Sequence, residues 1–166
     1  MTATRGKPTS DTSISQAGNL QDKQEMLHVT VMSFGYKRGA PPEANVVFDV
    51  RFLKNPYWVE ELRPLTGLDD AVQAYVLSQQ AAREFIESIV ALLCNVLPEI
   101  SRLKAKNFTI AFGCTGGQHR SATLAEALAA RLAEAFPHFA VKAVHRELSE
   151  AHDCQAKDAH SQEAGA

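Results

Sequence analysis

The residues best suited to chemistry stand together in one short stretch, in which a cysteine is followed after five residues by an arginine and a serine: Cys114, Arg120 and Ser121. Two adjacent glycines and a histidine lie between them. The apolar run 108–112, rich in β formers, predicts a strand before the stretch. Leucines four residues apart, at 124, 128 and 132, predict an amphipathic helix after it. The stretch is therefore a glycine-containing turn between a strand and a helix.

A turn of this kind is suited to hold an anion. The N–H groups at the start of a helix have no partners inside the helix, and the helix dipole adds about half a positive charge there. The guanidinium of Arg120 can donate two parallel hydrogen bonds to one oxyanion, and Ser121 can cap the helix. The residue pattern therefore predicts a phosphate-binding loop.

The same positive field favours a thiolate at Cys114, so a second reading is a cysteine-dependent phosphatase. Such an enzyme needs a nucleophilic cysteine, an arginine that clasps phosphate and a general acid. Those roles would fall to Cys114, Arg120 and Asp49. Gly113 precedes the cysteine where such phosphatases carry histidine, so binding without turnover is the preferred hypothesis, and no catalytic residue is assigned under it.

Length and composition narrow the class of protein. A chain of 166 residues is expected to form one domain. The net charge of −2 argues against a strongly electrostatic nucleic-acid binder. The three cysteines show no C-x-x-C spacing, which argues against a zinc site and a disulfide framework. No metal or cofactor is predicted. No apolar run has the length of a membrane span and no signal sequence follows Met1, so we expect a cytoplasmic protein without membrane partners.

Hydrophobic periodicity predicts an α/β fold, a single-domain sandwich with a mainly parallel sheet. The expected strands are 27–34, 45–52, 108–112 and 139–144, and the expected helices are 69–77, 80–97 and a third from His119 to Pro137. Residues 1–25 are predicted to be a disordered arm and 149–166 a flexible polar tail, with the folded domain between them at 26–148.

Three further expectations concern packing. The strand 45–52 opens with a continuous apolar run, which is typical of a parallel strand buried on both faces. The helix 80–97 is expected to end before Pro98 and to bury one face made of Phe85, Ile89, Leu92, Leu93 and Val96, with Cys94 in the core. Asp69 is expected to cap the first helix.

Asp49 and Arg51 stand near the end of the second predicted strand, two residues apart and so on one face. They can form a structural ion pair. They can also line the carboxyl end of the sheet, where open α/β folds bind ligands.

Five segments in order resemble a known family. They are SFGYK at 33–37, FDVRFLKNPYW at 48–58, LRPLTGLD at 62–69, GCTGGQHRSA at 113–122 and HREL at 145–148. Together they resemble the C-terminal domain of the RNase adapter protein family RapZ. The resemblance covers about Leu27 to Leu148.

The resemblance implies a non-enzymatic sensor domain that binds a phosphorylated amino sugar, glucosamine-6-phosphate, and presents a small RNA to an endoribonuclease. It implies that the phosphate is held by Thr115, Gly116, Gly117, Gln118, His119, Arg120 and Ser121. Asp49, Arg51 and Asn55 would approach the sugar, and Tyr36 and Lys37 would lie at the edge of the pocket or of bound RNA. Arg146 is a further candidate for contact with RNA on the basis of its charge. Family members usually carry an N-terminal ATPase domain, which the short arm replaces here, so ATP binding is not expected. The acidic tail predicts weaker RNA binding than in members with a basic tail.

Overall fold

Four parallel strands form the sheet of this protein, in the order β2-β3-β1-β4. The structure is a computed structural model that describes residues 26–148. The strands are β1 (His28–Gly35), β2 (Val46–Asp49), β3 (Asn107–Cys114) and β4 (Ala140–His145). The predicted α/β fold with a parallel sheet is therefore confirmed. The segments predicted to be a disordered arm and a flexible tail lie outside the described residues.

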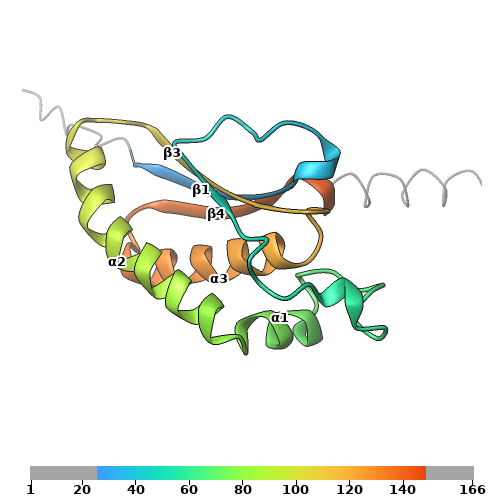
Figure 1. Ribbon diagram of the computed structural model, residues 1–166. Helices are drawn as coiled ribbons and strands as arrows, with labels where there is room; N and C mark the ends of the chain where they lie inside the picture. The colour runs from blue at the N-terminus through green and yellow to red at the C-terminus, as the bar shows by residue number, and fades with distance from the viewer. Residues whose placement is uncertain (1–25, 149–166) are drawn as a thin grey trace, which may run out of the picture.

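The α-helices are α1 (Asp70–Leu77), α2 (Gln80–Arg102) and α3 (Arg120–Ala135), and two short 3-10 turns are η1 (Tyr36–Arg38) and η2 (Pro56–Trp58). Figure 1 shows the three α-helices on one side of the sheet, while the connection from β1 to β2 passes on the other side. None of the helices in the described part is long and apolar enough to cross a membrane.

The core forms where α3 packs on the sheet. Val29 and Val31, alternate residues of β1, are fully buried. The leucines of α3 at 124, 128 and 132 are fully buried as well, and α3 contacts β1, β3 and β4. The four-residue spacing of the leucines puts them on the face of the helix that meets the sheet. The predicted helix after the loop is confirmed, and it packs against β1, β3 and β4.

The prediction for α2 is wrong at its end and partly wrong on its face, where Ile89 and Leu93 are buried as predicted. The helix continues through Pro98 to Arg102. Its buried residues are Ala82, Ile86, Ile89, Leu93 and Leu97, whereas Leu92 is 52% exposed and Cys94 is exposed. A helix buries residues that recur every three or four positions, and this set selects a face rotated away from Leu92. Cys94 is therefore not in the core.

The second strand is shorter and more exposed than predicted. It ends at Asp49 and pairs only with β3, so β2 is an edge strand and is not buried on both faces. Phe48 packs on the helix side, against Phe85 and Phe112, while Val47 points to the other side and is 40% exposed. Strand β2 is exposed because it lies at the edge of the sheet, and the apolar run in its sequence does not specify that position.

Asp69 occupies the residue before α1, as predicted, but its side chain does not cap the helix. Its carboxylate accepts hydrogen bonds from the Thr66 N–H at 2.7 Å and the Thr66 hydroxyl at 2.8 Å. These bonds lower the pKa of Asp69. The carboxylate thus shapes the preceding turn, which packs on the start of α3.

Candidate functional site

The carboxyl ends of β1 and β3 are neighbours from which the chain departs in opposite directions. From β1 the chain passes over the open face of the sheet to β2, while from β3 it passes through α3 on the other face to β4 (Figure 1). In open α/β sheets, ligands bind at such a switch point. Residues 115–119, which connect β3 to α3, lie there.

The loop is fixed to the end of β1 by backbone contacts. A Cβ atom on Gly35 would lie 2.5 Å from the Gly116 carbonyl carbon, so only glycine fits there. The Lys37 N–H donates to the Thr115 carbonyl at 3.1 Å. Gly117 has a φ of 80°, a left-handed conformation that glycine adopts without strain. The two predicted loop glycines therefore have different tasks, since a Cβ on Gly116 would meet open space.

Arg120 lies at the start of α3 and is only 4% exposed. One Nη atom donates to the carbonyls of Arg51 at 3.0 Å and Leu53 at 2.9 Å. The other donates to the Thr115 hydroxyl at 3.2 Å, and the buried Nε has no partner. Burial lowers the pKa of Arg120, but an arginine stays protonated at neutral pH. Every acceptor bonded to this guanidinium is neutral, so no hydrogen-bonded anion compensates its charge.

Cys114 lies under the loop, 3% exposed at the end of β3. Its Sγ accepts the Gly117 N–H at 3.2 Å and lies 3.1 Å from the hydroxyl of Ser121. Ser121 is fully buried, so its hydroxyl faces the sulfur and not solvent. Cys114 at the end of β3, Gly117 in the loop and Ser121 in α3 thus lie together, and their predicted roles stay predictions.

The His119 ring lies near the backbone of residues 62–65, in the segment that precedes α1. It is 7% exposed, and its Nε2 has no hydrogen-bond partner. Burial lowers the pKa of His119, which keeps the imidazole neutral at pH 7. Next to it, the Gly67 N–H donates to the Gln118 carbonyl at 2.7 Å, while the Gln118 side chain is exposed. The segment around Gly67 therefore supports the outer side of the loop.

Asp49 and Arg51 form an ion pair at the rim of the loop. The Arg51 side chain donates two hydrogen bonds to Asp49 Oδ2, at 2.6 and 3.0 Å, and its guanidinium lies 4.4 Å above the Tyr36 ring. Hydrogen bonds from Arg51 hold the pKa of Asp49 below its usual value, with a smaller contribution from the charge of Arg120. The structural ion pair and the location at the carboxyl end, posed as alternatives from sequence, are both observed.

Three other predicted site residues lie at the periphery. Asn55 caps η2, because its side chain accepts the Tyr57 N–H at 3.4 Å. Lys37 is exposed on η1. Arg146 donates to the carbonyls of Ala40 at 2.8 Å and Gly35 at 2.9 Å, so its guanidinium braces the end of β1.

Sequence reasoning missed Glu147, which is 7% exposed and lies behind the loop. Its Oε1 accepts the Gly35 N–H at 3.1 Å and the Nε of Arg146 at 2.8 Å. Its Oε2 has no hydrogen-bond partner and would lie 2.3 Å from a Cβ atom on Gly117. Glu147 therefore leaves no room for a side chain at Gly117. The one feature of the sequence that could have identified Glu147 is its position just after the fourth predicted strand, in the HREL segment.

A second buried polar group was also missed. The Ser33 hydroxyl, fully buried on β1, lies 2.9 Å from Nδ1 of His145, whose Nε2 lies 2.7 Å from Oε1 of Glu126 on α3. The chain of contacts ties β1, β4 and α3 together. Because Ser33 has no access to solvent, this group supports the fold and is not a catalytic triad.

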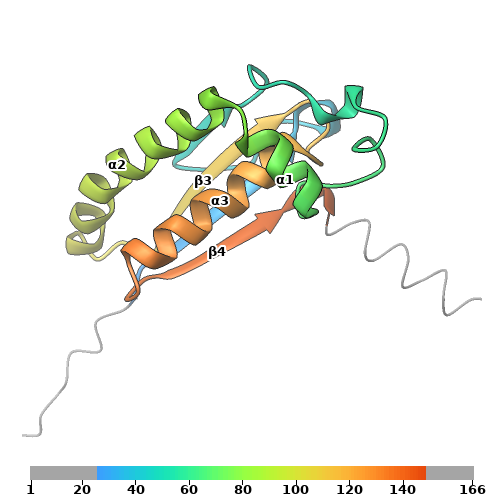
Figure 2. The same ribbon diagram turned by 90° about the horizontal axis from the view of Figure 1, so that it is seen from below.

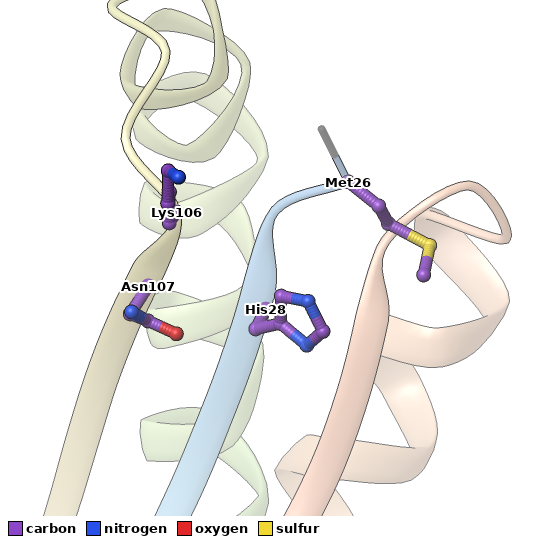
Figure 3. A pocket seen from close by; sticks show the side chains of 4 residues that line it. All are labelled: Met26, His28, Lys106 and Asn107. Atoms are coloured by element: carbon purple, nitrogen blue, oxygen red, sulfur yellow. The ribbon is translucent and has the colours of Figure 1, made fainter. Parts of the chain in front are cut away.

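A hollow of about 320 Å³ lies at the other end of the sheet and is lined by Met26, His28, Lys106 and Asn107 (Figure 3). These residues precede or begin β1 and β3, so the hollow is at the amino ends of the strands, remote from the loop. Residues 26–148 contain no group of three His, Cys, Asp or Glu side chains that could hold a metal ion. The loop remains the candidate site.

Comparison with known proteins identifies the family of this chain. A family model described as the RapZ C-terminal domain matches residues 27–149. A nucleotide-binding protein of Acidothermus cellulolyticus is 49% identical over 130 residues, 76% of this chain and 42% of the relative. Another, of Cutibacterium acnes, is 52% identical over 124 residues, 75% of this chain and 42% of the relative. The chain spans about two fifths of the length of the curated relatives it matches. It belongs to the RapZ C-terminal domain family.

Proposed function

We propose that this domain binds a phosphorylated amino sugar such as glucosamine-6-phosphate and does not transform it. The observation that carries the proposal is the buried Arg120, whose guanidinium is bonded only to neutral acceptors and retains an unpartnered Nε. A buried cation that lacks a bonded anion is costly, and a bound phosphate would supply one. The N-terminus of α3 adds to the same field.

In this proposal the phosphate lies on the open side of the loop, over Thr115 and Gly116, which are partly exposed. The sugar ring extends toward Asp49 and Arg51 at the rim, where carboxylate and guanidinium offer an acceptor and a donor for amino and hydroxyl groups. Asn55 follows in the same segment, which Arg120 anchors through two carbonyls. The domain boundaries 26–148 are proposed on the same basis, because this segment contains every group named.

Titration calorimetry tests the proposal. We expect the full chain to bind glucosamine-6-phosphate, and to bind unphosphorylated glucosamine at least about tenfold more weakly, since charge-assisted hydrogen bonds contribute about 1.5–3 kcal/mol each. Glucose-6-phosphate measures the contribution of the amine. Adenosine monophosphate tests whether a nucleotide occupies the loop, as the names of the longer relatives would suggest. Equal affinity for glucosamine and its phosphate would contradict the proposal.

A cysteine phosphatase is the second candidate, favoured by the Gly117 N–H that points at Cys114 Sγ. Two observations weigh against turnover. The sulfur is buried, and Asp49, the predicted general acid, has its pKa lowered by Arg51. A general acid must carry a proton at working pH, and a carboxyl with a lowered pKa is ionised there. The binding function is therefore preferred.

Replacing Cys114 with serine separates these candidates. We expect Cys114→Ser to keep its affinity for glucosamine-6-phosphate within about threefold, because the hydroxyl can still accept the Gly117 N–H. Hydrolysis of an aryl phosphate should stay at background in both proteins. Turnover by the wild type that disappears in the serine variant would establish the phosphatase instead.

RNA binding by this chain is expected to be weak and strongly salt-dependent. The net charge is −2, and of the three predicted RNA contacts Tyr36 lies beneath Arg51 while Arg146 is engaged by backbone carbonyls. Contacts with phosphates release counterions, so affinity should fall as salt rises. Filter binding at two salt concentrations measures the slope. Tight binding that is insensitive to salt would contradict this prediction and would point to base-specific contacts.

A further inference from the structure

Glu147 lies just past β4, at the end of the sheet where β3 leads into the proposed phosphate-binding loop (Figure 2). Ser33 of β1 is paired with His145, the last residue of β4, so β4 ends before it reaches the level of Gly35. The carboxylate of Glu147 accepts the buried Gly35 N–H at 3.1 Å. A buried N–H without an acceptor is costly. A side chain therefore replaces the backbone acceptor that β4 does not provide.

Gly35 is also the residue on which the loop rests. A Cβ atom on Gly35 would lie 2.5 Å from the Gly116 carbonyl carbon and 2.7 Å from the Gly117 nitrogen, so the two backbones are in direct contact. The Gly35 carbonyl accepts a hydrogen bond from Arg146 at 2.9 Å. Consecutive residues, Arg146 and Glu147, thus hold both polar groups of the Gly35 backbone. A shift of Gly35 would move the loop with it.

The second carboxylate oxygen of Glu147 faces the loop directly. A Cβ atom on Gly117 would lie 2.3 Å from Oε2, and the Cβ position of a glycine is the direction of one of its Cα hydrogens. That hydrogen therefore points at Oε2, which is a weak Cα–H···O contact. Gly117, whose φ is 80°, thus contacts Glu147 through its Cα and Cys114 Sγ through its N–H.

The hydrogen bonds that Glu147 accepts within the described part of the chain end on one oxygen. Oε1 accepts the Gly35 N–H and the Nε of Arg146, while the buried Oε2 has no hydrogen-bond partner. The single carbonyl oxygen of a glutamine can accept the same two donors. The position therefore requires an acceptor of this length, and the charge is not needed for either bond.

We infer that Glu147 is a positioning residue of the proposed phosphate site. It is 7% exposed, with its unpartnered oxygen buried against the loop, so it does not touch the ligand. It holds Gly35 and Gly117, and these two glycines set the direction of the loop N–H groups that receive the phosphate. The inference rests on the proposed function for its ligand, whereas the contacts that it assigns to the loop are present without one.

Calorimetry with glucosamine-6-phosphate gives the first test. Glu147→Met keeps the length of the side chain but removes the acceptor, so it should bind the ligand at least about tenfold more weakly. Glu147→Ala, which also removes the bulk, should show the same loss or a larger one. Glu147→Gln keeps the acceptor and should stay within about threefold of the wild type. Circular dichroism identifies a temperature at which all variants are folded.

Glu126→Ala is the matched control for a general loss of stability. Glu126 lies on α3, and its carboxylate contacts His145, the residue that ends β4, at 2.7 Å. The variant weakens the packing of the same strand, while Glu147 keeps its contacts with Gly35 and Gly117. Its affinity for glucosamine-6-phosphate should equal that of the wild type.

Alkylation of Cys114 tests the inference without a ligand. The thiol is 3% exposed beneath the loop, so its reaction with iodoacetamide reports how often the loop opens. Peptide mass spectrometry separates Cys114 from the exposed Cys94. The rate at Cys114 should rise at least about fivefold in Glu147→Met and stay unchanged in Glu147→Gln. A wild type that binds no phosphosugar would refute the proposed function alone, since these rates would still decide whether Glu147 holds the loop.

Three patterns of results would overturn the inference. Wild-type affinity or wild-type alkylation in Glu147→Met would show that the loop works without the acceptor. Equal losses of affinity in Glu147→Met and Glu147→Gln would assign the effect to the charge. Equal losses in Glu147→Met and Glu126→Ala would assign it to general stability.

Discussion

Replacing Arg120 with alanine is expected to weaken the binding of glucosamine-6-phosphate by about 2–4 kcal/mol, a loss of roughly 30- to 1000-fold. The variant loses the one buried cation of the loop. It also leaves the carbonyls of Arg51 and Leu53 without their donor, so the rim segment that carries Asp49 and Arg51 loosens. Calorimetry, performed at a temperature at which circular dichroism shows a folded variant, measures the loss.

Two further variants make this result interpretable. Arg131→Ala removes a guanidinium from the far end of the same helix, where Arg131 pairs with the exposed Glu87, and should bind as the wild type does. Thr115→Val removes a hydroxyl that Arg120 contacts without emptying the buried space, and should weaken binding by about 1 kcal/mol. Wild-type affinity in Arg120→Ala would refute the placement of the phosphate at this residue.

The second large effect concerns the contact between the loop and the first strand. Gly35→Ala is expected to lower the free energy of unfolding by about 2–4 kcal/mol, because the new methyl group would lie 2.5–2.7 Å from backbone atoms of Gly116 and Gly117. These backbone atoms cannot move aside as a flexible side chain can. Urea denaturation of the two proteins measures the difference.

Gly116→Ala is the matched control for this substitution. A Cβ atom there meets nothing within 4 Å, so the free energy of unfolding should change by no more than about 1 kcal/mol. The methyl group would project where the phosphate is proposed to lie, and ligand affinity should fall. Stability lost equally in both variants would show that the close approach at Gly35 does not limit the fold.

What the sequence predicts well in this domain is local. The strand, glycine turn and helix at 108–135 follow from spacing alone, and the structure contains them. The partners of Arg120 do not follow, because the carbonyls of Arg51 and Leu53 are 69 and 67 residues away along the chain. The sequence predicts only that Arg120 binds a ligand. In the fold Arg120 also holds the segment of Arg51 and Leu53 through hydrogen bonds to their carbonyls.

The incorrect predictions depend on which elements lie next to one another in the fold, and the hydrophobic pattern of the sequence does not specify this. Strand β2 has apolar residues in succession, yet it lies at the edge, since only strand order determines how many partners a strand has. Helix α2 offers two adjacent apolar faces, and the one that packs on the core leaves Leu92 outside. Glu147 was not predicted as a site residue because a single carboxylate produces no periodic signal in the sequence. The residue matters because its carboxylate accepts the N–H of Gly35, which lies 112 residues earlier in the chain.

The strand order also determines how this domain acquires its structure. Paired segments are far apart in the chain, from Asn45 with Thr109, 64 residues apart, to Ser33 with His145, 112 apart. The parallel sheet contains no hairpin in the described residues, so almost no pairing is local, and folding of such a topology is slow. The interior strand β1 emerges from the ribosome before the other three strands of the sheet, while its partner β4 and the carboxylate of Glu147 emerge after them. A nascent chain that stops before Ala140 therefore carries the complete sequence of the proposed phosphate-binding loop without the strand and the carboxylate that contact it.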